Sequence, residues 1–273
     1  MKEAFVDVDS LKVRYLESGN DIIKDAKIRK RSKRHLLFIH GLGSFSDRWL
    51  DIPDALSLDF NTVAVDLPGF GGSDKPAKMN YTIEKFADVI SKFMQKTGID
   101  GNTSIIGHSL GGYIALELAG KIELDKLVLI DSSGLLDGPT PLLEKYLDVA
   151  LNPSKQAVRR VFEQLVANPA RIPEVLVDGF IFRINQQGSR HAFESAFHNS
   201  TTTQTSRLQK ISIPTLLIWG SEDRLIPLDY YYRFKKNLRG AKSVIINDAG
   251  HAPFAEKPAL VCEIMRRFLR NSP

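Results

Sequence analysis

Residues 107–111 read Gly-His-Ser-Leu-Gly, and they stand between an apolar run at 103–106 and a helical pattern that begins at Leu110. A Gly-x-Ser-x-Gly pentapeptide between a strand and a helix is typical of a nucleophile elbow, in which a strained turn directs the serine hydroxyl away from the sheet. The glycines let strand and helix approach closely, and the helix directs backbone N–H groups toward negative charge. We therefore predict that Ser109 is a nucleophile. The alternative is a glycine-rich turn with an incidental serine.

A serine hydroxyl is a weak nucleophile near neutral pH and needs an adjacent base. Of the six histidines, His251 is the best placed, because it follows the last predicted strand, at the edge where α/β sheets carry their sites. Its second ring nitrogen needs an acceptor that fixes the working tautomer. Asp223, which follows another predicted strand, is our choice for this acid. Glu222 and Asp131 are the alternatives, and Asp131 is the stronger of the two because it ends the preceding strand.

Acyl transfer also needs donors for the oxyanion of a tetrahedral intermediate. One donor should be the N–H of Leu110, directly after the nucleophile. The other should come from the loop His40-Gly41-Leu42-Gly43, in which we choose the N–H of Leu42. The glycines make this turn feasible, and we expect the His40 side chain to organise it by hydrogen bonding. A generic glycine turn is the alternative.

Short apolar runs bounded by Gly, Asp or Asn alternate with helical periods along the chain. This alternation predicts an α/β fold, a mostly parallel sheet covered by helices on both faces. The predicted strands are 5–8, 11–17, 36–39, 62–65, 103–106, 127–130, 215–219 and 243–246, of which the first two are antiparallel. The predicted helices around the sheet are 83–94, 110–119, 230–238 and 259–269.

The region 134–208 breaks this alternation. It contains helical patterns and no convincing strand, and the patterns lie at 142–151, 155–166, 173–184 and 189–199. We predict a core domain of residues 1–133 and 209–273, with 134–208 as a helical cap. Apolar cap residues are expected to face the substrate, and simple packing between cap helices is the alternative. The predicted substrate-binding residues are Gly41, His108, Leu135, Tyr146, Phe180 and Phe182.

The composition is that of an ordinary soluble globular protein, since 43% of the 273 residues are hydrophobic and 25% are charged. A single cysteine, Cys262, excludes a disulfide within the chain. The first fifteen residues lack a continuous apolar segment, and no run is long enough to span a bilayer. We therefore expect a cytoplasmic protein without a membrane partner. The sequence is compatible with a homodimer.

Much of the formal net charge of +5 lies in residues 24–34, which read KDAKIRKRSKR. A patch for nucleic acid or anionic lipid is one interpretation. The segment has no interleaved aromatic residue for base stacking, so we favour a solvated surface hairpin and expect no nucleic-acid partner.

His191, Glu194 and His198 could share one helical face as metal ligands. No further cluster of ligand residues accompanies them in the sequence, so solvated cap residues are the better interpretation. We expect neither a metal nor a cofactor.

Five pieces of the sequence together resemble the α/β-hydrolase superfamily, in its carboxylesterase and carbon–carbon bond hydrolase branch. These pieces are 40–43, 66–73, 107–112, 219–223 and 250–251. The order Ser109, Asp223, His251 is also the order of the triad in this family. The resemblance implies an eight-stranded sheet with a helical cap between the sixth and seventh strands, and a serine hydrolase with this triad.

The resemblance is less specific for the substrate. Related dehalogenases and epoxide hydrolases use an aspartate nucleophile, and Ser109 argues against both. Carbon–carbon bond hydrolases usually carry a tryptophan directly after the catalytic histidine, where this chain has Ala252. The cap run 183–197 nevertheless looks broadly like theirs.

Our leading hypothesis is a carboxylesterase that cleaves esters of small to medium, largely apolar acyl groups through an acyl-enzyme intermediate. The alternative is a carbon–carbon bond hydrolase of vinylogous diketone acids. A carboxylate-binding arginine that faces the site would favour it, and Arg183 and Arg190 are candidates. A third hypothesis, a non-catalytic binding protein on a hydrolase scaffold, is disfavoured by the intact Ser, Asp and His.

Overall fold

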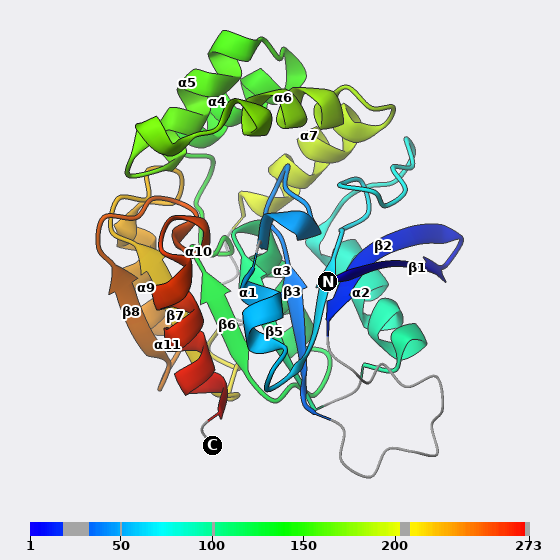
Figure 1. The fold of residues 1–273 in the computed structure, drawn as a ribbon, viewed down its shortest axis with the longest axis vertical. Helices are drawn as coiled ribbons and strands as arrows, with labels where there is room; N and C mark the ends of the chain where they lie inside the picture. The colour runs from blue at the N-terminus through cyan, green and yellow to red at the C-terminus, as the bar shows by residue number, and fades with distance from the viewer. Residues whose placement is uncertain (19–32, 50, 100–101, 203–207, 271–273) are drawn as a thin grey trace.

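Eight strands form one hydrogen-bonded sheet in the order β1-β2-β4-β3-β5-β6-β7-β8 (Figure 1). The computed structural model describes residues 1–18, 33–49, 51–99, 102–202 and 208–270. The strands are β1 (Lys2–Val8), β2 (Leu11–Ser18), β3 (His35–Ile39), β4 (Asn61–Val65), β5 (Thr103–His108), β6 (Leu127–Ile130), β7 (Thr215–Gly220) and β8 (Lys242–Ile246). The pairs β1–β2 and β2–β4 are antiparallel, and every later pair is parallel. The predicted mostly parallel α/β sheet is confirmed.

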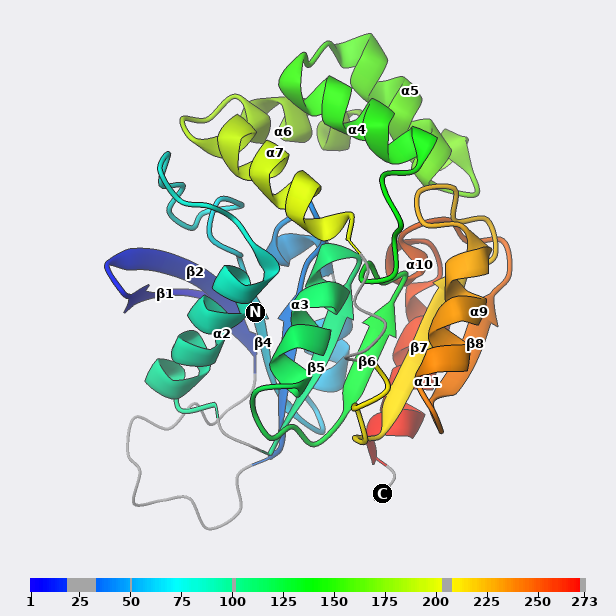
Figure 2. The same ribbon diagram turned by 180° about the vertical axis from the view of Figure 1, so that it is seen from behind.

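Helices cover both faces of the sheet (Figure 2). One face carries α2 (Ile83–Thr97), α3 (Leu110–Ala119) and α9 (Leu228–Asn237), and the other carries α1 (Ile52–Leu56) and α11 (Pro258–Arg270). Each face of the sheet has its own hydrophobic core. Because side chains alternate along a strand, Leu37 of β3 packs in the core beneath α2, α3 and α9, and Phe38 packs in the core beneath α1 and α11. Because both faces are covered, the central strands are apolar at successive positions.

The predicted strands and long helices are all present, and their ends differ from the prediction by no more than three residues. The short helices η2 (Ser46–Trp49), α1 and α10 (Pro253–Glu256) were not predicted, because so few residues carry no helical period. Most of the basic segment 24–34 lies outside the described residues. Within the described part of the chain, no helix has both the length and the apolar character that crossing a membrane requires.

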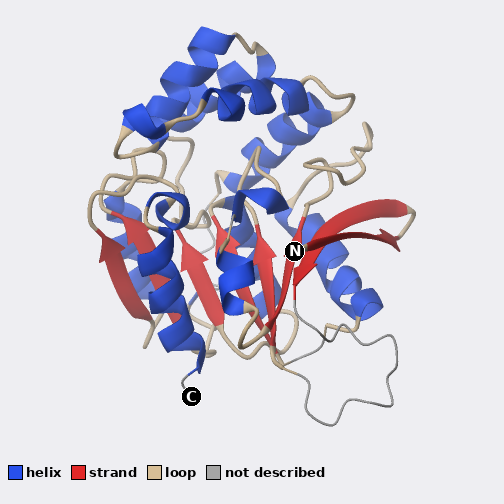
Figure 3. Ribbon diagram, viewed as in Figure 1, coloured by secondary structure: helices blue, strands red, loops and turns tan. Residues whose placement is uncertain are grey.

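A layer of helices from the region 134–208 lies over the carboxyl ends of the parallel strands (Figure 3). It contains α4 (Pro141–Leu151), α5 (Lys155–Leu165), η3 (Pro169–Arg171), α6 (Glu174–Ile184) and α7 (Ser189–Ser200). Local sequence sets where two of them begin: Thr140 caps α4 through the N–H of Leu143, and Ser154 caps α5 through that of Ala157. The layer covers the sheet edge at which the predicted site residues lie.

Candidate active site

Ser109 occupies a strained turn between β5 and α3, with φ 52° and ψ −117°. Such a backbone conformation costs about 1–3 kcal/mol in a residue other than glycine. The surrounding packing holds Ser109 in this conformation. The same close packing requires glycine at position 111, because a Cβ there would lie 2.1 Å from the carbonyl oxygen of Ile39. The turn places Ser109 on the wall of a pocket that His251 also lines.

His251 and Asp223 meet at this pocket from two different loops. His251 follows β8 and Asp223 follows β7, and Nδ1 of His251 lies 2.8 Å from Oδ2 of Asp223. The other oxygen, Oδ1, accepts hydrogen bonds from the N–H groups of Leu225 (2.8 Å) and Ile226 (3.0 Å). With Nδ1–H donating to the carboxylate, Nε2 is the nitrogen that can accept a proton.

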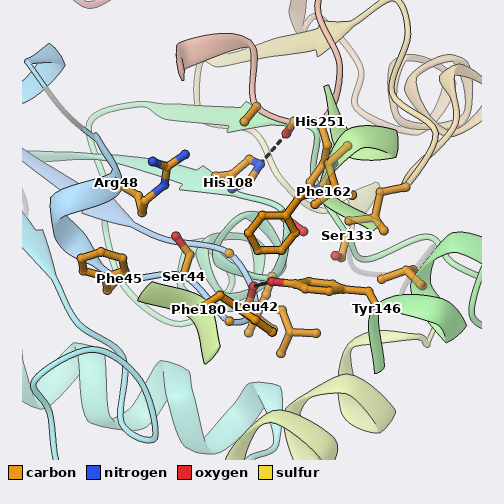
Figure 4. A pocket seen from close by; sticks show the side chains of 18 of the residues that line it. Leu42, Ser44, Phe45, Arg48, His108, Ser133, Tyr146, Phe162, Phe180 and His251 are labelled. Carbon is orange, nitrogen blue, oxygen red and sulfur yellow. Dashed lines mark hydrogen bonds between the residues drawn. The ribbon is translucent and has the colours of Figure 1, made fainter. Parts of the chain in front are cut away.

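The backbone of His251 is held from two sides. Its N–H donates to the carbonyl oxygen of Leu165, at the end of α5, over 2.7 Å. Its own carbonyl oxygen accepts a hydrogen bond of 2.7 Å from Nε2 of His108 (Figure 4). Burial, assisted by the neighbouring His251, lowers the pKa of His108 well below its ordinary value. His108 is therefore neutral, with its hydrogen on Nε2, and it ties the elbow to the histidine loop.

The residues of the two predicted oxyanion donors, Leu42 and Leu110, both line the pocket. Leu110 is the first residue of α3, where the N–H has no partner within the helix. Leu42 lies in a turn closed by a 3.2 Å hydrogen bond from the Ser44 N–H to the Gly41 carbonyl oxygen. Gly43 completes this turn at φ 69°, a conformation that glycine adopts without strain.

The His40 imidazole holds the turn in place. Its Nε2 accepts a hydrogen bond from the N–H of Leu67 (3.0 Å), and its Nδ1 donates to the carbonyl oxygen of Gly41 (2.8 Å). Burial lowers the pKa of His40, so the neutral ring satisfies both contacts. His40 thereby joins the glycine turn to the loop after β4.

The pocket is a cavity of about 150 Å³ between the sheet edge and the helical layer. A cavity of this size has room for a group comparable to a small aromatic ring. Its walls are mostly apolar, and the Tyr146 hydroxyl donates to the carbonyl oxygen of Leu42 over 3.2 Å (Figure 4). Four of the predicted substrate-binding residues line it: Gly41, His108, Tyr146 and Phe180.

Two predicted substrate-binding residues lie elsewhere, and the structure corrects both. Leu135 is buried outside the pocket lining, and its neighbour Leu136 takes that place. Phe182 is 69% exposed. Two residues along a helix span about 200°, so Phe182 and Phe180 lie on opposite sides of α6.

Two arginines interrupt the apolar wall: Arg48 from η2 and Arg183 from α6. The Arg183 guanidinium lies 4.0 Å from the ring centroid of Phe45, and its buried Nε has no hydrogen-bond partner in the described part of the chain. Burial lowers the pKa of both arginines. Sequence reasoning missed Arg48, whose only signal is its position shortly after the glycine turn. Arg190 lies away from this wall and donates to Asn185.

The alternative acids Asp131 and Glu222 and the candidate metal ligands of α7 lie at different places in the structure. Within the described ranges, the one group of potential ligand side chains close enough to share an ion is Asp131, Asp223 and His251, and Nδ1 of that histidine already pairs with Asp223. Glu222 is not part of this group. The candidates on α7 form no such group: Nε2 of His191 instead contacts the carbonyl oxygen of Met79 at 2.9 Å.

A family model described as the α/β-hydrolase fold matches residues 34–258, a range that contains every residue placed at the pocket above. The chain belongs to the α/β-hydrolase family. Lipase 3 of Moraxella sp. strain TA144 is 29% identical to this α/β-hydrolase over 229 residues, covering 81% of the chain and 72% of the lipase.

Solved structures are similar over nearly the whole chain. A bacterial membrane phospholipase A superposes with a TM-score of 0.84 at 27% identity, covering 99% of this α/β-hydrolase and 87% of the phospholipase. The 2-hydroxy-6-oxo-6-phenylhexa-2,4-dienoate hydrolase of Rhodococcus sp. strain RHA1 has a TM-score of 0.86 at 24% identity, with 99% of each chain covered. The second likeness concerns the fold alone.

Proposed function

We propose that this α/β-hydrolase is a serine hydrolase that cleaves carboxylic esters of small to medium, largely apolar acyl groups. One observation carries the proposal: Ser109 and His251 line the same pocket, and Nδ1 of His251 lies 2.8 Å from Oδ2 of Asp223. The mostly apolar cavity of about 150 Å³ supports an acyl group of modest size. The similarity to a lipase and a phospholipase supports ester chemistry.

The proposed reaction follows from the hydrogen bonds at the pocket. Nε2 of His251 removes the proton of Ser109 as its oxygen attacks the ester carbonyl, and the N–H groups of Leu42 and Leu110 bind the oxyanion. Asp223 stabilises the imidazolium. His251 then protonates the leaving alcohol, and a water molecule activated by the same imidazole releases the acid.

We also propose that residues 134–208 form a cap on a core of residues 1–133 and 209–273. Hydrogen bonds between the two parts support a functional link. The His251 N–H donates to Leu165 at the end of α5, and Glu256 accepts from the N–H groups of both Ala167 and Gly250. A shift of α5 would therefore displace the proposed base.

A fluorophosphonate probe tests the nucleophile together with the acyl preference. We expect one covalent adduct, which peptide mass spectrometry places on Ser109. In a separate assay we expect p-nitrophenyl acetate and butyrate to be hydrolysed faster than a p-nitrophenyl ester of a long-chain fatty acid. Absence of both labelling and ester turnover would reject the proposal.

Arg183 favours a second candidate, the hydrolysis of a carbon–carbon bond in vinylogous diketone acids. Arg183 and Arg48 both line the pocket. The carboxylates of Asp47 and Asp66, which act on Arg183 electrostatically, form their salt bridges with Arg14 in the described part of the chain. Arginine binds carboxylates through paired, charge-assisted hydrogen bonds. The pocket therefore offers a place for a substrate carboxylate.

Replacement of Arg183 by methionine separates the two candidates. If a substrate carboxylate binds there, R183M lowers kcat/KM for a diketone acid by about 10- to 100-fold, the value of one charge-assisted contact, and changes p-nitrophenyl butyrate turnover by less than about 3-fold. R190M is the matched control, because Arg190 lies away from the pocket lining. Equal effects of R183M on both substrates would remove the case for a carboxylate site.

A further inference from the structure

Asp131 is a buried carboxyl group that the proposed reaction does not use. It follows β6 with φ 44°, and its side chain has no contact with solvent. Its Oδ1 accepts a hydrogen bond of 2.9 Å from the N–H of Gly220. Its Oδ2 is also buried and accepts no hydrogen bond from the described residues. An ionised carboxylate in this position would leave one oxygen unsatisfied at a high cost in free energy.

The sheet brings Asp131 against the acid of the triad. β6 pairs in parallel with β7, with Ile130 opposite Ile218, so that Asp131 and Asp223 lie just beyond neighbouring strand ends. Ligand atoms of Asp131, Asp223 and His251 all lie within 4.8 Å of one another. Two carboxylates this close in a buried site do not both ionise.

The hydrogen bonds decide which carboxyl keeps the proton. Asp223 accepts from three donors, the N–H groups of Leu225 and Ile226 and Nδ1 of His251, and donors of this kind favour the ionised form. Asp131 accepts from one. Burial raises the pKa of Asp131 well above its ordinary value, and the charges of Asp223 and Glu256 raise it further.

We propose that Asp131 is a positioning residue that stays protonated during catalysis and presents its Oδ2–H to the Asp223 carboxylate. The proton turns the unsatisfied acceptor into a donor beside an anion. Asp131 then steadies Asp223 and reduces the negative charge that His251 senses, without adding a second charge. The catalytic part of this inference rests on the proposed serine hydrolase function, whereas the protonation state does not.

Two variants test the role of the proton through the pH dependence of ester turnover. In D131N the amide keeps the shape and supplies the donor, so we expect kcat/KM within about 3-fold of wild type and the same acid limb of the pH profile. D131A removes the donor and should lower kcat/KM about 10-fold, with the acid limb at higher pH because the full charge of Asp223 acts on His251. An acid limb that moves to lower pH in D131N would show that Asp131 is ionised and would overturn the proposal.

The protonation state is also measurable without any activity. In protein labelled with ¹³C-aspartate, we expect a protonated-carboxyl infrared band in the wild type at neutral pH that is absent from D131N. Absence of the band from the wild type overturns the proposal even if the variant does not fold. A band from a protein that hydrolyses no ester would reject the proposed function and retain the protonated Asp131.

Thermal unfolding gives a second such measurement. The pKa of Asp131 is raised in the folded state, so the unfolded chain, with an ordinary pKa of about 3.9, releases a proton that the folded state holds. Wild type therefore loses stability relative to D131N as the pH rises above about 4. We expect the Tm of D131N minus that of wild type to grow by roughly 5–10 °C between about pH 4.5 and 7.5, because each pH unit over which Asp131 stays protonated adds to the difference. A difference that is constant or shrinks with pH contradicts a protonated Asp131.

Discussion

Replacement of Ser109 by alanine should lower kcat for p-nitrophenyl butyrate by a factor on the order of 10³–10⁶. The reason is that Ser109 supplies the nucleophile, and no water molecule can replace it in the same strained position. The pocket and the backbone N–H groups of Leu42 and Leu110 stay in place, so we expect little change in KM. Release of p-nitrophenol under saturating substrate measures the effect.

The matched control is Ser91→Ala on α2, a helix whose residues are not part of the pocket lining. S91A should keep wild-type turnover.

The strained backbone at position 109 gives a second test. Ser109 has φ 52° and ψ −117°, so Ser109→Gly should unfold at a higher temperature than Ser109→Ala, since glycine adopts these angles without strain. If S109A kept more than about a tenth of the wild-type rate, Ser109 would not be the nucleophile.

Replacement of His251 by alanine should be nearly as damaging, with kcat/KM reduced on the order of 10³–10⁶-fold, because the base and the nucleophile act as one unit. The loop itself should persist, since it is held through the backbone of residue 251 by Leu165 and His108. The variant then leaves an imidazole-sized space beside Ser109. Added imidazole should raise the rate of the variant by at least about 10-fold, because it can bind in place of the deleted ring and act as the base.

His191→Ala is the control for this variant, because His191 lies on α7 and contacts Met79 rather than the pocket. H191A should behave as wild type and show no response to imidazole. The S109A/H251A double variant should be no slower than either single variant, and added imidazole should not rescue it. If the fold-loss of kcat/KM in the double variant equalled the product of the losses in the two single variants, Ser109 and His251 would not share one proton transfer.

Motifs with local physical causes could be found without coordinates. The pentapeptide around Ser109 is recognisable in the sequence, because close backbone contacts require glycine at 107 and 111. Asp223 and His251 are recognisable because each follows the end of a strand. Hydrophobic periodicity predicted the long helices, because it too is a local property of the sequence. It could not tell that Phe182 faces solvent while Phe180 faces the pocket, because only the neighbours of α6 determine which side of that helix is inward.

Local order along the chain was thus sufficient for the α/β class, the strand succession and the three side chains proposed for catalysis, since each depends on patterns a few residues long. The folded arrangement alone decided that His251 pairs with Asp223, that Asp131 lies buried beside them, and that Arg48 and Arg183 share one pocket wall. These relations join segments that are far apart in sequence. Distance, burial and charge between such segments arise only when the sheet aligns its strand ends and the helical layer closes over them.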